Sequence, residues 1–151
     1  MTRPIPFEEL AALAGQEVSV SDWFEVAQAR IDAFAEATDD RQWIHVDPER
    51  CRRESPFGGP VAHGFLTLSL LPAMLESAIS IGGMRMGVNC GLDKVRFVAP
   101  LPAGSRVRAR WTLAEAEPVR GGLQLRWNAS VESESGGRPV CTAEFLVRCY
   151  A

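Results

Sequence analysis

The sequence has few of the residues and motifs that carry nucleophilic, nucleotide-dependent or metal-dependent chemistry. It contains 2 histidines and 4 cysteines among 151 residues, and no two cysteines have the Cys-x-x-Cys spacing that is typical of zinc sites. It also has no Gly-x-Ser-x-Gly nucleophile elbow, no Gly-x-Gly-x-x-Gly fingerprint and no Walker lysine motif. No residue pattern therefore indicates a metal ion or a cofactor.

The sequence also lacks an excess of positive charge and a long apolar segment. Its formal net charge of −3 argues against a nucleic-acid-binding protein. The N-terminal residues have no apolar core, so no secretory signal is predicted. The longest apolar stretch, residues 65–81, is interrupted by polar residues and is slightly short for a membrane span. With no disulfide framework evident, we expect a reduced, cytoplasmic protein that binds neither membrane nor nucleic acid.

What is present is the composition of an ordinary globular protein, with 46% hydrophobic and 23% charged residues. A chain of 151 residues is long enough to bury one hydrophobic core without disulfides or a metal. It has no internal repeat, no low-complexity tract and no linker. We therefore expect a single domain over residues 1–151.

Three segments in the second half alternate apolar and polar residues with a period of two. They are residues 107–113, 123–131 and 141–149, and Gly121-Gly122 and Gly136-Gly137 stand between them. This alternation predicts strands with one face on the core, and the glycine pairs predict turns. A less regular strand is expected over residues 86–98. Cys141 and Cys149 fall on apolar faces, so we expect them to act as small core hydrophobes.

A helix is predicted over residues 65–79, where apolar residues cover nearly all sides. Such a helix is expected to be buried all round, and Pro72 predicts a kink or a break within it. In the first half, short helices are expected over residues 7–13 and 29–37, and Asp47-Pro48 is typical of a helix start. Strands that meander around one apolar helix predict an α+β fold, with an antiparallel sheet curled around a central helix.

One dense polar segment, residues 38–48, could carry acid–base chemistry. Asp40 and His45 would point roughly 140° apart on a regular helix, so they converge only if the chain leaves helical geometry here. A converged Asp–His pair can hold one water and exchange protons with it. The alternative is a solvated loop, in which Asp39 follows a helix, Asp47 caps one and Arg41 faces solvent.

A second candidate segment, residues 60–64, directly precedes the apolar helix. Backbone N–H groups at a helix start lack helical acceptors, and they could polarise a carbonyl oxygen as an oxyanion hole does. The alternative is that Gly64 only permits close packing. His63 is expected to be a structural, hydrogen-bonding residue.

Three motifs in this order resemble one known family. The segment Thr38-Asp39-Asp40-Arg41-Gln42-Trp43-Ile44-His45-Val46-Asp47 resembles the hydratase motif of the MaoC-like dehydratases, the (R)-specific enoyl-CoA hydratases of hot-dog fold. Residues 57–68 resemble the entry to that family's central helix, and residues 89–97 with Pro100 resemble the strand after it. The Gln42-Trp43-Ile44-His45 variant is similar to the nodulation-protein-N-like branch. The resemblance covers nearly the whole chain and keeps the three motifs in order.

The resemblance implies a hot-dog fold and a reaction. Asp40 falls at the catalytic aspartate, which acts as base toward a water, and His45 at the catalytic histidine, which orients the water and helps deliver a proton. The Gly64 amide falls at the donor to the thioester carbonyl. The implied substrate is a trans-2-enoyl thioester of CoA or acyl carrier protein, and the product is an (R)-3-hydroxyacyl thioester. The family also implies a homodimer, as do the exposed edges of a short sheet.

One position departs from the family pattern. The family commonly has glycine before the catalytic aspartate, where this sequence has Asp39. Asp39 adds a negative charge beside Asp40, which disfavours ionisation of Asp40, and glycine tolerates backbone dihedrals that aspartate does not favour.

Two other functions stay open. A hot-dog thioesterase would hydrolyse the thioester, although the spacing of Asp40 and His45 fits the hydratase motif better. A catalytically idle hot-dog dimer would bind acyl thioesters or serve as a subunit of a larger dehydratase.

Overall fold

The long strands form where the sequence alternates apolar and polar residues. A computed structural model describes residues 3–151. Strands β6 (Ser105–Val119), β7 (Gly122–Ser133) and β8 (Cys141–Tyr150) follow one another as antiparallel neighbours. Their buried positions are every second residue, and they include Trp111 and Trp127, both 0% exposed. The three predicted strands and the core role of Cys141 and Cys149 are confirmed.

More exposed strands complete the sheet on both sides. Strand β5 (Met86–Phe97) pairs with β8, while β2 (Gln16–Val20) and β3 (Phe24–Val26) both pair with β6. The strand order is therefore β2-β6-β7-β8-β5, with β5 at a free edge. A separate parallel pair joins β1 (Ile5–Pro6) to β4 (Ile81–Gly82).

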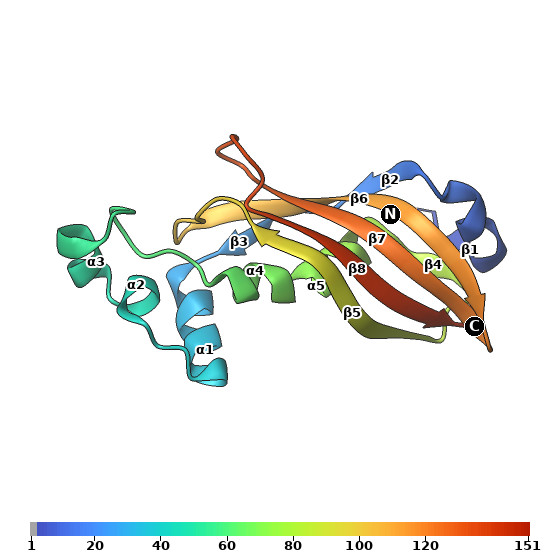
Figure 1. The fold of residues 1–151 in the computed structure, drawn as a ribbon, viewed down its shortest axis with the longest axis horizontal. Helices are drawn as coiled ribbons and strands as arrows, with labels where there is room; N and C mark the ends of the chain where they lie inside the picture. The colour runs from blue at the N-terminus through green and yellow to red at the C-terminus, as the bar shows by residue number, and fades with distance from the viewer. Residues whose placement is uncertain (1–2) are drawn as a thin grey trace.

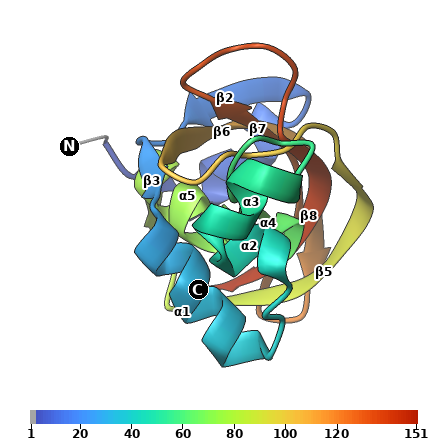
Figure 2. The same cartoon turned by 90° about the vertical axis from the view of Figure 1, so that its left-hand side faces the viewer.

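The apolar helix lies on the concave side of the sheet, as Figures 1 and 2 show. It is broken into α4 (Gly64–Ser69) and α5 (Leu71–Ala78), and Pro72 stands in the first turn of α5. The predicted break at Pro72 is thus confirmed, because proline fits the start of a helix but not its interior. Leu71 and Met74 are 1% and 0% exposed. An antiparallel sheet curled around a central helix is the predicted α+β fold.

The expectation that this helix is buried all round is wrong at one end. Phe65 in α4 is 66% exposed, and its ring contacts Phe97 of β5 edge-on, with ring centroids 5.6 Å apart. Phe97 is itself 48% exposed. Side-chain periodicity records which residues are apolar, but it does not record where the covering sheet ends. Phe65 lies beside the free edge formed by β5, where this chain provides little cover.

The remaining helices lie together at one end of the sheet (Figure 1). They are α1 (Gln28–Thr38), α2 (Trp43–Val46) and α3 (Pro48–Glu54). A 3-10 helix, η1 (Phe7–Leu13), lies apart from them, near the N-terminus. The Asp47 carboxylate accepts the N–H of Arg50 at 3.0 Å, which confirms the predicted helix start. The sequence did not predict α2, a one-turn helix within the polar segment.

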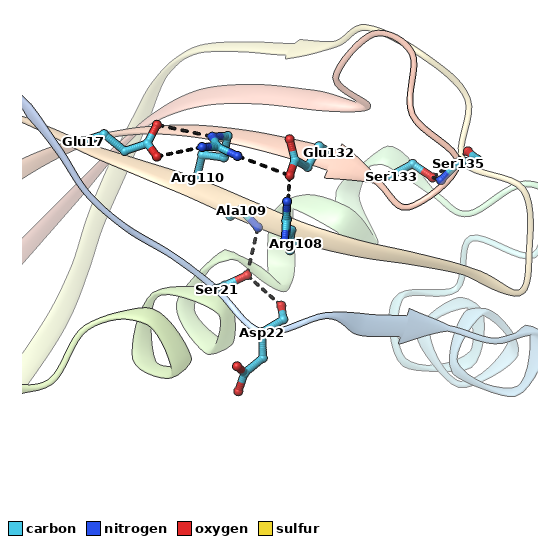
Figure 3. A network of polar contacts seen from close by, with 9 residues as sticks. All are labelled: Glu17, Ser21, Asp22, Arg108, Ala109, Arg110, Glu132, Ser133 and Ser135. Atoms are coloured by element: carbon cyan, nitrogen blue, oxygen red, sulfur yellow. Dashed lines mark hydrogen bonds and ion pairs between the residues drawn. The ribbon is translucent and has the colours of Figure 1, made fainter. Parts of the chain in front are cut away.

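Polar contacts tie β2 and the residues after it to β6 and β7 (Figure 3). The Ser21 hydroxyl accepts the N–H of Ala109 at 2.9 Å and donates to the Asp22 carbonyl at 2.8 Å. Arg110 bridges Glu17 of β2 and Glu132 of β7. Such exposed ion pairs contribute only about 0–1 kcal/mol each, so they select the register more than they stabilise the fold. No helix in residues 3–151 is long and apolar enough to cross a membrane.

Candidate active site

Helix α1 ends where the candidate site begins. Asp39, the capping residue directly after α1, has φ 61° and ψ 16°, the left-handed conformation that commonly ends a helix. The chain therefore leaves helical geometry between Asp39 and the start of α2. On one regular helix, Asp40 and His45 would point roughly 140° apart, because each residue turns the helix by roughly 100°. The exit from helical geometry removes this divergence. The condition that the sequence sets for their convergence is met.

The charge of Asp39 faces an arginine. The Arg41 guanidinium lies 3.0 Å from the Asp39 carboxylate and donates two hydrogen bonds to Glu36, at 2.7 and 3.0 Å. This pairing holds the pKa of Glu36 below its usual value. Asp39 is thus the predicted helix-exit residue, and Arg41 is exposed, as predicted, while it pairs with two acids.

Asp40, His45 and His63 come together from three separate segments. One ligating atom of each side chain lies within 4.8 Å of those of the other two. Asp40 is exposed, whereas His45 and His63 are only 8% and 2% exposed. An exposed carboxylate beside two buried imidazoles leaves one side of the group accessible to a small molecule. The structure thus brings the predicted pair Asp40 and His45 together.

The orientation of His45 is set by main-chain groups. Its Nδ1 lies 2.6 Å from the carbonyl oxygen of Val61, which can only accept a hydrogen bond, so Nδ1 carries a proton. Nε2 of the neutral ring then has a free lone pair. The main-chain carbonyl of His45 accepts a hydrogen bond from the Gln28 side chain of α1 at 2.7 Å. Both contacts fix the ring relative to α1 and to the segment before α4.

Gly64 is the first residue of α4. The N–H groups of Leu66 and Thr67 both reach the carbonyl of His63, and the N–H of Gly64 precedes them, where a helix offers no acceptor. A Cβ added at Gly64 would lie 2.8 Å from the ring of Phe97. The close packing expected at Gly64 is therefore confirmed, while its role as a donor stays a prediction.

A cavity of about 290 Å³ opens beside Gly64. Its walls also include Ile44, which precedes His45, and Val61, which holds His45. The other side chains are mostly apolar, among them Phe57 and Phe97. Asp40, His45 and His63 are not among the lining residues, so the cavity borders the helix start and two residues that adjoin or bind His45.

The arrangement of the two imidazoles does not suit a metal ion. The His45 and His63 rings are stacked, with centroids 3.8 Å apart and planes inclined by 23°. The lone pairs of stacked rings lie in two nearly parallel planes, whereas the ligands of a tetrahedral metal ion must converge on it from different directions. Asp40 and the free nitrogen of His45 can instead share the two hydrogens of one water molecule.

Sequence reasoning missed the contacts that hold the site. The main-chain carbonyl of Val61 and the side chain of Gln28 belong to no recognisable motif, because one acts through its backbone and the other from a helix distant in sequence. His63 was expected to be a structural residue, and its Nε2 does lie 2.9 Å from the main-chain oxygen of Asp40. Its stacking on His45 was not foreseen, although its position next to Gly64 was the available signal.

The family is established by comparison with known proteins. Residues 9–134 match the family model described as "MaoC like domain". The chain belongs to the MaoC-like dehydratase family. Its predicted fold class, family and hydro-lyase class are confirmed.

Two curated relatives align over most of this family member. It is 46% identical over 144 residues to "3-hydroxyacyl-thioester dehydratase Z" of Mycobacterium tuberculosis, with 95% of each chain covered. It is 51% identical over 135 residues to "Nodulation protein N" of Rhizobium leguminosarum bv. viciae, with 87% of this chain and 83% of that protein covered. The predicted likeness to the nodulation-protein-N-like branch is therefore confirmed.

A solved structure of an R-hydratase has the same fold. "R-Hydratase PhaJ1 from Pseudomonas aeruginosa in the unliganded form" superposes with a TM-score of 0.78 and 22% sequence identity, over 97% of this chain and 86% of that chain. This MaoC-like protein is therefore a hot-dog hydratase or dehydratase by fold and family.

The backbone of Asp39 makes a first prediction about stability. Asp39→Gly is expected to leave the free energy of unfolding unchanged or to raise it slightly, because glycine adopts the left-handed conformation freely. Asp39→Ala should lower it by about 1 kcal/mol, because alanine lacks the short polar side chain that lets aspartate tolerate the left-handed conformation. Urea unfolding at one protein concentration measures both. Asp39→Asn, which tolerates this conformation without the charge, is the control, and a loss in Asp39→Asn equal to that in Asp39→Ala would assign the effect to charge.

The packing at Gly64 makes a second prediction. Gly64→Ala is expected to destabilise the protein, because the new methyl group would overlap the Phe97 ring. Phe97→Ala should remove most of that penalty, so the double variant should be more stable than the sum of the two single changes by about 0.5–3 kcal/mol. Strictly additive losses in urea unfolding would place the strain elsewhere.

Proposed function

We propose that this protein is an (R)-specific enoyl-CoA hydratase, which adds water to trans-2-enoyl thioesters and catalyses the reverse dehydration. The observation that carries the proposal is the meeting of the Asp40 carboxylate and the His45 imidazole beside the start of α4. Both groups can accept a hydrogen bond from one water molecule. The relative named 3-hydroxyacyl-thioester dehydratase Z supports this class of substrate.

In the proposed hydration, Asp40 and His45 hold the water and Asp40 acts as the base. One O–H bond of the water breaks as its proton moves to Asp40 and its oxygen bonds to the β-carbon. The electrons of the double bond pass through the α-carbon to the thioester oxygen, and the N–H of Gly64 donates a hydrogen bond to that oxygen.

The second half of the reaction returns the proton to the substrate. The enolate takes a proton at its α-carbon from the Asp40–His45 pair, and His45 helps to deliver it. The thioester carbonyl re-forms, and the pair ends in its starting protonation state. Water has then been added across the double bond with no redox step, so the reaction needs only the side chains and the main-chain amide.

The free edge of β5 supports a homodimer. Four of the large exposed hydrophobic residues lie on this strand: Met86, Val88, Leu92 and Phe97, which are 38–53% exposed. β5 has 12 residues, and within residues 3–151 its only neighbouring strand is β8. A long apolar edge with unpaired backbone groups is a template for pairing with another chain. We therefore propose that two copies join their β5 edges.

A cytoplasmic location stays a prediction.

Turnover of crotonyl-CoA tests the proposed reaction. The purified protein should consume the enoyl thioester, followed by its absorbance, and chiral analysis should identify the (R)-3-hydroxy product. Asp40→Asn and His45→Gln should each lower kcat by about 10²–10⁴-fold, the usual contribution of a general acid or base. Asp39→Asn removes the neighbouring carboxylate and should retain activity, which makes it the matched control.

Other outcomes of this assay point to the alternatives. Release of free CoA without hydration would indicate a thioesterase. Binding without turnover of crotonyl-CoA and longer enoyl thioesters, on CoA and on acyl carrier protein, would contradict the proposal and favour an idle binding subunit. Full activity in Asp40→Asn would remove Asp40 from the mechanism.

A charge on the β5 edge tests the dimer. Val88→Lys should shift the protein toward the monomer in light scattering at micromolar concentration, because pairing would bury an unpartnered ammonium group. Val88→Thr, which keeps the β-branched shape, should stay dimeric. Far-UV circular dichroism checks that both variants fold. A wild-type protein that is monomeric at this concentration would overturn the proposed edge pairing.

A further inference from the structure

We propose that His63 is a positioning residue that holds both members of the catalytic pair, an inference that rests on the proposed function. His63 directly precedes Gly64 in the sequence, and the residue is buried, with 2% of its surface exposed. It contacts Asp40 through a hydrogen bond and His45 through ring stacking. A single side chain therefore joins the base, the second proton-transfer group and the start of α4.

The hydrogen bond fixes the backbone at Asp40. Nε2 of His63 lies 2.9 Å from the main-chain oxygen of Asp40. A carbonyl oxygen only accepts, so Nε2 carries the proton and donates. This contact falls on the residue directly after the left-handed Asp39. The chain has no regular structure at this point, and the bond therefore supplies a restraint that helix geometry does not.

The ring stack fixes the plane of His45. The two imidazole centroids are 3.8 Å apart, and Phe34 of α1 also contacts His63, with ring centroids 5.0 Å apart. Nδ1 of His45 is held by the Val61 carbonyl, which leaves rotation about that bond as the remaining freedom. The flat face of His63 restricts this rotation and so holds Nε2 of His45 in place for the water of the proposed reaction.

The segment that carries His63 is anchored on both sides. The N–H of Val61 donates to Ile44 at 3.1 Å, and the N–H of Ala62 donates to Leu101 at 2.8 Å. After His63 the chain enters α4. A side chain on an anchored segment can transmit a fixed position to its neighbours, and groups held in place this way preserve the reacting geometry.

The remaining ring nitrogen distinguishes this role from ordinary polar packing. Nδ1 of His63 is buried and has no hydrogen-bond partner within the described part of the chain. A residue selected only to satisfy polar groups would leave no buried nitrogen unpaired, since each costs stability. The histidine combines a flat ring and one N–H at the end of it, and neither phenylalanine nor glutamine supplies both.

Two substitutions separate the two contacts. His63→Phe keeps a ring for stacking and loses the donor, while His63→Gln keeps a donor at a similar reach and loses the ring. Each should lower kcat by about 10–100-fold with KM little changed, because small displacements of catalytic groups reduce the rate without affecting substrate contacts. His63→Ala should lose more than either. In a His45→Gln background, the effect of His63→Gln should shrink, because the ring on which His63 stacks is already gone.

Imidazole ¹⁵N NMR tests the geometry without any enzymatic assay. The chain has 2 histidines, so a labelled sample gives two ring systems, and His63→Gln assigns them. We expect the proton of His45 on Nδ1 and that of His63 on Nε2. In His63→Gln, the Val61 carbonyl should keep the proton of His45 on Nδ1, while the His45 ring signals should broaden because the ring loses its stacking restraint.

The outcomes keep this inference apart from the proposed function. A proton on Nδ1 of His63 would overturn it, and so would a rise in KM that matches the fall in kcat. Loss of activity that tracks only a lower melting temperature would reduce His63 to a structural residue. An unreactive wild-type protein with the expected tautomers would contradict the proposed function and leave the geometry of His63 intact.

Discussion

The burial of the broken α4–α5 helix in the concave face of the sheet is the constraint on which the site depends. Leu71 and Met74 are almost fully buried, and the same core contains Trp111 and Trp127. Each such side chain stabilises the fold by roughly 1.5–3 kcal/mol relative to exposure. Because α4 begins at Gly64, fixing the helix also fixes His63 and Gly64. Asp40 and His45, the other two members of the site, come from the segment that includes the end of α1 and α2, at the same end of the sheet (Figure 1).

Both imidazoles are oriented by main-chain oxygens rather than by carboxylates. Val61 holds His45, and Asp40 holds His63. A backbone carbonyl cannot change its protonation state or swing away on a flexible side chain, and its position follows from the fold. The two carbonyl oxygens therefore fix the tautomers of His45 and His63, and neither imidazole N–H needs the Asp40 carboxylate as its acceptor. The single carboxylate at the site is therefore left for the reacting water.

The sequence predicted what depends on periodicity and local turn chemistry. The alternating strands, the break at Pro72 and the helix start at Asp47 each follow from a few adjacent residues. The convergence of Asp40 and His45 was foreseen as a condition, and the left-handed Asp39 fulfils it. The stacking of His63 on His45 and the hydrogen bond from the Gln28 side chain to the His45 carbonyl could not be predicted. Both contacts join segments whose mutual placement only the packed core determines.

The expectation for Phe65 failed for a reason that also informs function. An apolar helix is buried only where something covers it, and at Phe65 the chain's own sheet has ended. The neighbouring Phe97 lies on the free edge of β5 and at the same time packs directly on Gly64. Under the proposed pairing of β5 edges, a second copy would cover these rings and restrain Phe97. The position of the Gly64 amide would then depend on the assembled edge, so the site would be complete only in the pair.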